Sequence, residues 1–122
     1  MFLVDSSGWI EFFTDGQFAE RYAKYIKTPS RIITPTVVLY EVYKKIKKER
    51  TEEEALIAVS HMNKTRIIEL RESIALFAAD ISLKYALPMA DAIVYATAVE
   101  EHCRVVTGDA HFRDLENVIF VS

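Results

Sequence analysis

Residues 31–48 read RIITPTVVLYEVYKKIKK and contain the unit from which the chain is built. Arg31-Ile32-Ile33 is too short for a helix and rich in β-branched residues, so it predicts a strand. Thr34-Pro35 follows as an N-cap with proline at the first helical position, and the pattern behind it predicts a helix from Pro35 to about Lys48. A short strand followed by a longer helix is therefore the local pattern.

The same alternation extends over the whole chain. Four more short β-rich runs lie at Phe2–Val4, Arg66–Ile68, Arg104–Val106 and Val118–Val121. Helices are expected from near Ser6, over Gln17–Ile26 after an Asp15-Gly16 turn, from a Thr51-Glu52-Glu53-Glu54 capping box to about Asn63, and near Glu72–Tyr85 and Met89–His102. Strands separated by helices of this length pair in parallel. We predict one α/β domain over residues 1–122, a three-layer α/β/α sandwich around a mostly parallel five-stranded sheet.

The composition excludes several classes of protein. The 122 residues are 51% hydrophobic with a net charge of −3, and glycine and proline are few, so disordered and collagen-like chains are excluded. Cys103 is the only cysteine, which excludes an intrachain disulfide and a cysteine-based zinc site. The amino end lacks the basic start of a signal peptide, and Asp80, Lys84 and Asp91 interrupt the most apolar region. We expect no membrane span and a cytoplasmic location.

Four acidic residues stand out by position. Asp5 directly follows the first strand and Asp109 follows the fourth, so both are expected at the carboxyl edge of the sheet, where functional groups gather. Either one also fits a role as a helix cap or turn residue. Glu41 and Asp91 lie inside apolar helical runs. The helix dipole favours Asp91 in a first turn, and an intrahelical pair with Lys45 is the alternative for Glu41.

Together these acids indicate a cation. If all four face one rim of the sheet, burial and mutual repulsion raise their pKa values and cost several kcal/mol unless a cation neutralises them. A carboxylate set without clustered histidine or cysteine favours Mg²⁺ or Mn²⁺ over zinc. Such an ion lowers the pKa of a bound water and positions it in line with a phosphodiester. The residues therefore predict a metal-dependent nuclease.

Each acid sits in a short motif: VDSSGWI (4–10), TPTVVLYEV (34–42), DAIVYATA (91–98) and VTGDAHF (106–112). Each motif is weak alone. In this order, over residues 1–121, they resemble the PIN-domain ribonucleases, and among them the compact VapC-type toxins of bacterial and archaeal toxin–antitoxin pairs.

The resemblance implies roles for particular residues. The catalytic, metal-binding acids would be Asp5, Glu41, Asp91 and Asp109, with the hydroxyls of Ser6 and Thr107 orienting them. It also implies Mg²⁺- or Mn²⁺-dependent hydrolysis of RNA by an activated water, a homodimer, and inhibition by a VapB-type antitoxin. The alternative is a protein-binding module that keeps the PIN fold without catalysis. A phosphatase or receiver domain is disfavoured because no second aspartate stands two positions after Asp5.

Basic residues follow Glu41 along its helix. Lys44, Lys45 and Lys48 come three, four and seven positions later, on the same side, and are candidates to guide RNA phosphates, the alternative being a solvated lysine face. Asp114 and Glu69 are expected at the surface, although Asp114 would add a fifth carboxylate if it turned inward. His111 is expected to pack or hydrogen-bond at the edge of its motif.

Overall fold

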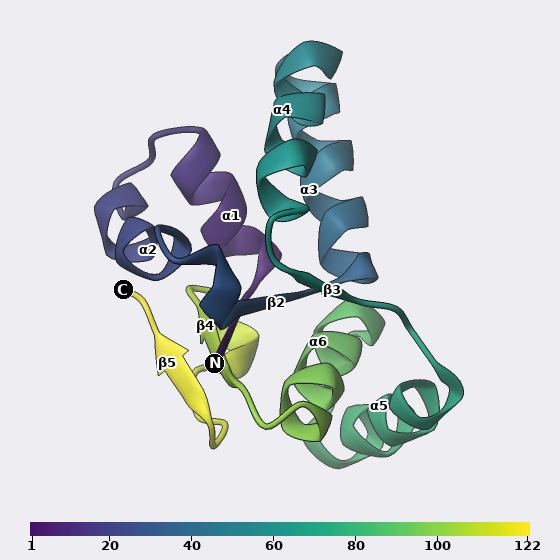
Figure 1. Ribbon diagram of the computed structural model, residues 1–122. Helices are drawn as coiled ribbons and strands as arrows, with labels where there is room; N and C mark the ends of the chain where they lie inside the picture. Colours follow the sequence, from purple (N-terminus) through teal and green to yellow (C-terminus); the bar gives the residue numbers. More distant parts are fainter.

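Five short strands form a fully parallel sheet in the computed structural model, which describes residues 1–122 (Figure 1). The strands are β1 (Phe2–Val4), β2 (Ile32–Pro35), β3 (Arg66–Ile68), β4 (Arg104–Thr107) and β5 (Val118–Phe120). Their order is β3-β2-β1-β4-β5, and every neighbouring pair is parallel, which confirms the predicted sheet. The chain moves outward from β1 to β3 and then returns to β4, so the strand order reverses between β1 and β4.

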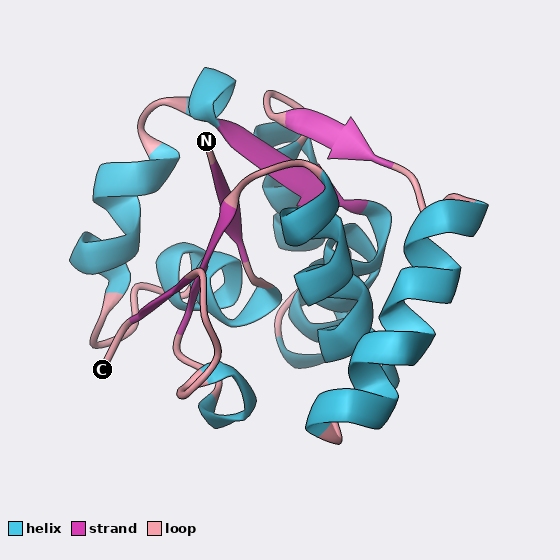
Figure 2. Ribbon diagram, turned by 90° about the horizontal axis from the view of Figure 1, so that it is seen from below, coloured by secondary structure: helices cyan, strands magenta, loops and turns pink.

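Six helices cover the two faces of the sheet. They are α1 (Ser6–Phe13), α2 (Ala19–Ile26), α3 (Thr36–Glu49), α4 (Glu52–Met62), α5 (Glu72–Tyr85) and α6 (Met89–Glu100), with single 3₁₀ turns η1 (Pro29–Arg31) and η2 (Ala110–Phe112). Helices α1 to α4 lie on one side of the sheet and α5 and α6 on the other (Figure 1; Figure 2). This is the predicted three-layer sandwich. No single helix is long and apolar enough to cross a membrane; α5 and α6 meet that test only as a pair, bent by 116°.

Most helix boundaries fall within two residues of their predicted positions. Thr51 caps α4 as expected, because its Oγ1 accepts a hydrogen bond of 3.0 Å from the backbone N–H of Glu54. Helix α6 ends at Glu100, before the predicted end, and the chain then turns through His102 in the left-handed region with φ 57°. Short-range capping thus explains where α4 starts, and an unusual backbone conformation explains where α6 stops.

The predicted cap at Thr34 is wrong. Strand β2 continues through Pro35, and α3 begins at Thr36 without a side-chain cap. Thr34 is fully buried, and its hydroxyl lies 2.6 Å from the hydroxyl of Thr65, the residue before β3. The hydroxyl group therefore bonds to a neighbouring segment of the sheet instead of to its own helix, since a tertiary partner satisfies it in the interior.

One continuous core joins the two helical layers through the sheet. Trp9 and Val38, from α1 and α3, are buried on one side, and Ile74 and Val94, from α5 and α6, are buried on the other. Cys103 is fully buried among them, as expected of a small apolar residue. The strands between these layers are held on both faces, so the residues at the strand ends have fixed positions.

Gly8 allows α1 to lie close to α2. A Cβ atom at this position would lie 2.5 Å from Cε1 of Tyr22 and 2.9 Å from Cγ1 of Val4, and both side chains are buried. We expect Gly8→Ala to lower the free energy of unfolding by about 1–3 kcal/mol, because overpacking forces these side chains to shift. Urea-induced unfolding measures the change.

Gly16→Ala is the control for this prediction. Its Cβ would meet only the carboxylate end of Glu11, which can move away at the cost of one 3.1 Å hydrogen bond from the backbone N–H of Phe18, so its effect should be smaller. Gly8 lies inside α1, where alanine would normally be more stable than glycine by about 1 kcal/mol. A gain in stability for Gly8→Ala would therefore contradict the close packing against Tyr22.

Candidate metal centre

Two acids lie at the point where the strand order reverses. Strands β1 and β4 pair with Val4 opposite Val106, so the residues that follow them leave the same edge of the sheet. Asp5 follows β1 directly, and its backbone N–H donates a 3.0 Å hydrogen bond to the carbonyl of Val106. Asp109 follows β4 by two residues. In open parallel sheets this reversal creates a crevice that binds ligands.

Asp5 is the most deeply placed of the four acids, with 3% of its surface exposed. Its Oδ2 accepts hydrogen bonds from the hydroxyls of Thr107, at 2.9 Å, and Ser7, at 3.4 Å. It stands at the N-cap of α1 but makes no side-chain cap hydrogen bond, so the capping explanation fails. Burial is the main cause that raises its pKa to about 6, and the charges of Glu41 and Asp109 add to the rise while the Thr107 hydroxyl opposes it.

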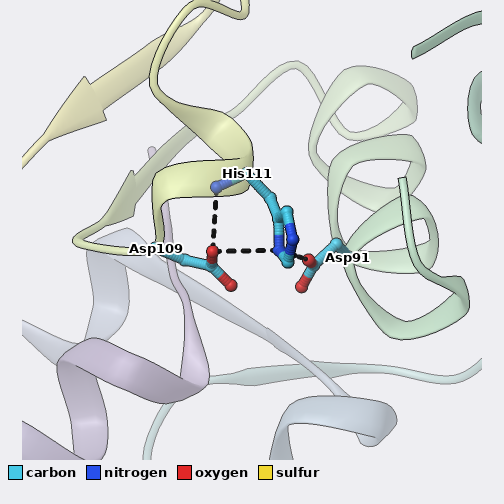
Figure 3. Close-up of side chains that lie close together, drawn as sticks. All are labelled: Asp91, Asp109 and His111. Carbon is cyan, nitrogen blue, oxygen red and sulfur yellow. Dashed lines mark hydrogen bonds and ion pairs between the residues drawn. The ribbon is translucent and has the colours of Figure 1, made fainter. Parts of the chain in front are cut away.

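Asp91 and Asp109 lie on either side of the His111 ring (Figure 3). Nδ1 of His111 is 2.8 Å from Oδ2 of Asp91 and 3.1 Å from Oδ1 of Asp109. One ligand atom from each of these three residues lies within 4.8 Å of the other two. The pKa of Asp91 is raised to about 6, chiefly by burial and then by the charges of Asp109 and Asp5. These residues are close enough to share one ion.

Asp109 also has the local role that its position suggested. Its Oδ1 accepts a 2.9 Å hydrogen bond from the backbone N–H of His111 and so caps the turn η2. Turn formation and membership of the acidic cluster are compatible, because a carboxylate has further lone pairs available after accepting one hydrogen bond.

Glu41 reaches the site from α3. It is half-buried, and its pKa is raised mainly by burial and further by the charges of Asp91 and Asp109, while a hydrogen bond from the Ser6 hydroxyl lowers it. Lys45 forms its ion pair with Glu49, at 3.2 Å, and not with Glu41. The intrahelical pair considered for Glu41 is therefore wrong, and no basic side chain neutralises this carboxylate.

The donor set fits a divalent cation. The charges of neighbouring carboxylates add to the raised pKa values of Asp5, Glu41 and Asp91. None of the four acids forms an ion pair with lysine or arginine. Only His111 pairs with any of them. Asp5 and Glu41 lie outside the three-residue set of Asp91, Asp109 and His111. They are coupled to it by charge: Asp5 raises the pKa of Asp91, and Asp91 and Asp109 raise the pKa of Glu41. The expectation of a carboxylate set without a clustered histidine is therefore wrong, because His111 belongs to this three-residue set. The carboxylates themselves are clustered, partly buried oxygen donors without a lysine or arginine partner, and such donors suit Mg²⁺ or Mn²⁺.

Hydroxyl groups tie the acids together. Thr107 Oγ1 donates to Asp5 and accepts a 3.0 Å hydrogen bond from the backbone N–H of Asp109, so it links two of the carboxyl-bearing residues. The structure thus places Ser6 beside Glu41 and Thr107 beside Asp5, the two hydroxyls that the motifs indicated. It adds Ser7, which the sequence reasoning missed, 3.4 Å from the Thr107 hydroxyl. The only signal for Ser7 was its place in the first motif.

Of the remaining candidate residues, two lie outside the acidic cluster and one lies inside it. Asp114 and Glu69 are exposed on connecting segments and take no part in the cluster. His111 does hydrogen-bond, as expected: its backbone N–H donates to Asp109 and its ring bonds to Asp91. Nδ1 also lies close to both acids, which puts the ring inside the site. Its position two residues after Asp109 was the available signal, since a single turn there folds the ring back over the carboxylate.

A groove of about 340 Å³ runs beside Glu41 along α3. Among its lining residues are Ser6, Tyr40, Glu41 and the three lysines Lys44, Lys45 and Lys48. The ammonium of Lys44 lies over the ring of Tyr40, 5.4 Å from its centroid. Lys45 is paired with Glu49, whereas Lys44 and Lys48 have no carboxylate partner. An open groove with unpaired cations thus begins at the acidic cluster.

Comparison with known proteins identifies the family and the fold. The sequence profile of the PIN domain matches residues 2–118. A toxin–antitoxin complex from Klebsiella pneumoniae is similar in structure, with a TM-score of 0.82, 22% identity, and coverage of 98% of this chain and 96% of that one. A Mycobacterium tuberculosis VapC toxin that cleaves the sarcin–ricin loop has a TM-score of 0.72 and 16% identity, and the match covers 85% of each chain. DNA-bound VapBC from Salmonella typhimurium has a TM-score of 0.76 and 16% identity, and the match covers 98% of this chain and 96% of that one. A search of curated proteins gave no match.

Replacing the buried acid should stabilise the metal-free protein. The pKa of Asp5 is raised in the folded state from 3.8 to about 6, so its charged form opposes folding. The penalty is absent well below pH 3.8, grows between the two pKa values and is complete above pH 6. An asparagine at this position would be neutral throughout, so we expect Asp5→Asn to raise the free energy of unfolding by roughly 1–3 kcal/mol at neutral pH.

Urea unfolding in EDTA, near pH 4 and near neutral pH, measures this effect. We expect the gain to be small in acid and large at neutral pH. Asp114→Asn, the same change at an exposed position, is the matched control and should do little at either pH. A gain for Asp5→Asn that is equal at the two pH values would contradict an electrostatic origin.

Proposed function

Since this chain belongs to the PIN domain family, we propose that it is a metal-dependent endoribonuclease, the VapC-type toxin of a toxin–antitoxin pair. The observation that carries the proposal is the meeting of Asp5, Glu41, Asp91 and Asp109 at one sheet edge without a lysine or arginine to neutralise them. A cluster that is costly when empty has a reason to exist if it holds Mg²⁺ or Mn²⁺.

The four acids divide into two that would hold the ion and two that border it. Asp91 and Asp109 face each other closely enough to hold one ion, and Asp5 and Glu41 border the same site from β1 and α3. Thr107 and Ser7 fix the orientation of Asp5 through its Oδ2. When bound, a divalent ion lowers the pKa of a water and stabilises charge on a phosphate. No serine–histidine pair is needed for such hydrolysis.

The lysine-lined groove supports a polyanionic substrate. Lys44 and Lys48 lie in the groove that begins at Glu41, and Tyr40, which is 60% exposed, offers a ring there on which a base can stack. RNA is the polyanion we propose, consistent with the RNA-cleaving toxin among the structural relatives. The chain's net charge of −3 makes this local cationic groove more important, because the rest of the surface does not attract nucleic acid.

The structural relatives include toxin–antitoxin complexes, and we extend this to partners of the present chain. We propose that it acts in the cytoplasm as a single-domain protein, forms a homodimer, and is inhibited by a VapB-type antitoxin. A catalytically inactive PIN-fold binding module is the competing function, and the uncompensated acids disfavour it because a binding surface does not require them.

Loss of one metal-binding acid should abolish cleavage. Purified free of antitoxin, the protein should cut RNA in Mg²⁺ or Mn²⁺ and stop in EDTA. We expect Asp91→Asn to reduce the rate about 100-fold or more, because even partners that only orient metal ligands are worth 10–100-fold. The measurement is the initial rate of cleavage of a labelled RNA, and Asp114→Asn is the control for the same chemical change at an exposed site.

Two outcomes would count against the enzyme. Cleavage that persists in Asp91→Asn at the wild-type rate would assign the activity to another site or to a contaminant. Absence of cleavage by the folded wild type on any RNA tested, with no effect of Mg²⁺ or Mn²⁺ on its melting temperature, would favour the binding module.

The unpaired lysines should control RNA affinity more than turnover. In the Asp91→Asn background, where cleavage is expected to be too slow to deplete the RNA during the measurement, we expect Lys44→Ala with Lys48→Ala to weaken binding. The slope of log affinity against log salt should become shallower by about 0.7 per lost phosphate contact. Fluorescence anisotropy at several salt concentrations measures it. Lys84→Ala, on α5, is the control, and an unchanged slope in the groove variant would mean that these lysines are only a solvated face.

A further inference from the structure

The imidazole of His111 lies where a ligand to the same ion would lie (Figure 3). Its Nδ1 points between Asp91 and Asp109, at 2.8 Å and 3.1 Å from one oxygen of each. Adjacent ligands on an octahedral ion with bonds of 2.1 Å are about 3.0 Å apart. Nδ1 is thus already spaced from each of the two carboxylate oxygens as a neighbouring ligand of the same ion would be, and all three residues offer ligand atoms within 4.8 Å of one another.

The turn η2 aims this ring. Phe112, the next residue, is fully buried and anchors the turn in the core. On the other side, Asp109 accepts the backbone N–H of His111 and fixes the start of the turn. The ring itself is more than half exposed and contacts no aromatic side chain, and the two carboxylates are its only polar partners. Its position is therefore set by the backbone and not by packing of the ring.

We propose that His111 supplies Nδ1 as a ligand to the divalent ion held by Asp91 and Asp109, which makes the centre a mixed nitrogen and oxygen site. This inference rests on the proposed metal-dependent function. A neutral imidazole binds transition ions well, whereas Mg²⁺ takes oxygen ligands and keeps several waters. His111 therefore raises the affinity of this centre for Mn²⁺ more than its affinity for Mg²⁺.

The purely structural alternative makes a different prediction. If His111 only bridges the two acids by hydrogen bonds in the metal-free protein, the arriving ion displaces the ring and no nitrogen is bound to it. Glutamine at this position can keep a hydrogen bond to the acids but has no ring nitrogen. The variant His111→Gln thus distinguishes a ligand from a hydrogen-bonding side chain.

The test is pulsed electron paramagnetic resonance of the full chain loaded with Mn²⁺ alone. We expect modulation from a directly bound ¹⁴N nucleus in the wild type and its loss in His111→Gln. Titration calorimetry should show Mn²⁺ affinity falling about tenfold or more in this variant, the low end of what loss of a supporting group costs, with a much smaller change for Mg²⁺. His61→Gln and His102→Gln, at exposed positions outside the cluster, should retain the wild-type signal.

The outcomes separate this inference from the function beneath it. Mn²⁺ that binds the wild type without a nitrogen signal, or with a signal that survives in His111→Gln, overturns the assignment of His111 and leaves the acidic site in place. A wild type that binds neither Mn²⁺ nor Mg²⁺ overturns the proposed metal-dependent function as well. The wild-type spectrum is decisive by itself if the variant does not fold.

Discussion

Burial of carboxylates at one edge of the sheet, reinforced by their mutual repulsion, opposes the folding of this chain, and much of the structure serves to hold these groups in place. Asp5 is almost fully buried, and both it and Asp91 have pKa values raised to about 6. The groups meet because β1 and β4 run parallel and adjacent at the reversal of strand order. The apolar core on both faces of the sheet supplies the stability that such an arrangement requires.

The support around the acids is short-range and rigid. Thr107 bonds to Asp5 and to the backbone of Asp109, and Asp109 in turn closes the turn that carries His111. Each of these bonds involves a residue at the end of a strand or in a single turn next to one, so the side chains have little freedom to move apart. In the metal centre that we propose, side chains held this firmly would favour binding of the ion, because little reorganisation is needed.

Local sequence patterns predict the elements well where the cause is local. The Thr51 capping box and the β-branched runs give correct helices and strands because their signals act within a few residues. The same reasoning fails at Thr34, whose hydroxyl meets Thr65 across the sheet. It also misses the need for glycine at position 8, which arises from Tyr22 in another helix. In both cases the deciding neighbour is distant in the chain.

For the site, the amino-acid order alone determined which acids were unusual, because Glu41 and Asp91 stand in apolar runs and Asp5 and Asp109 follow strands. The ordered motifs extended this to a family and a metal. Only the folded arrangement decided that Lys45 pairs with Glu49 instead of Glu41, and that His111 lies between two carboxylates. Those choices depend on distances between side chains from separate elements, and such distances exist only once the sheet has brought the elements together.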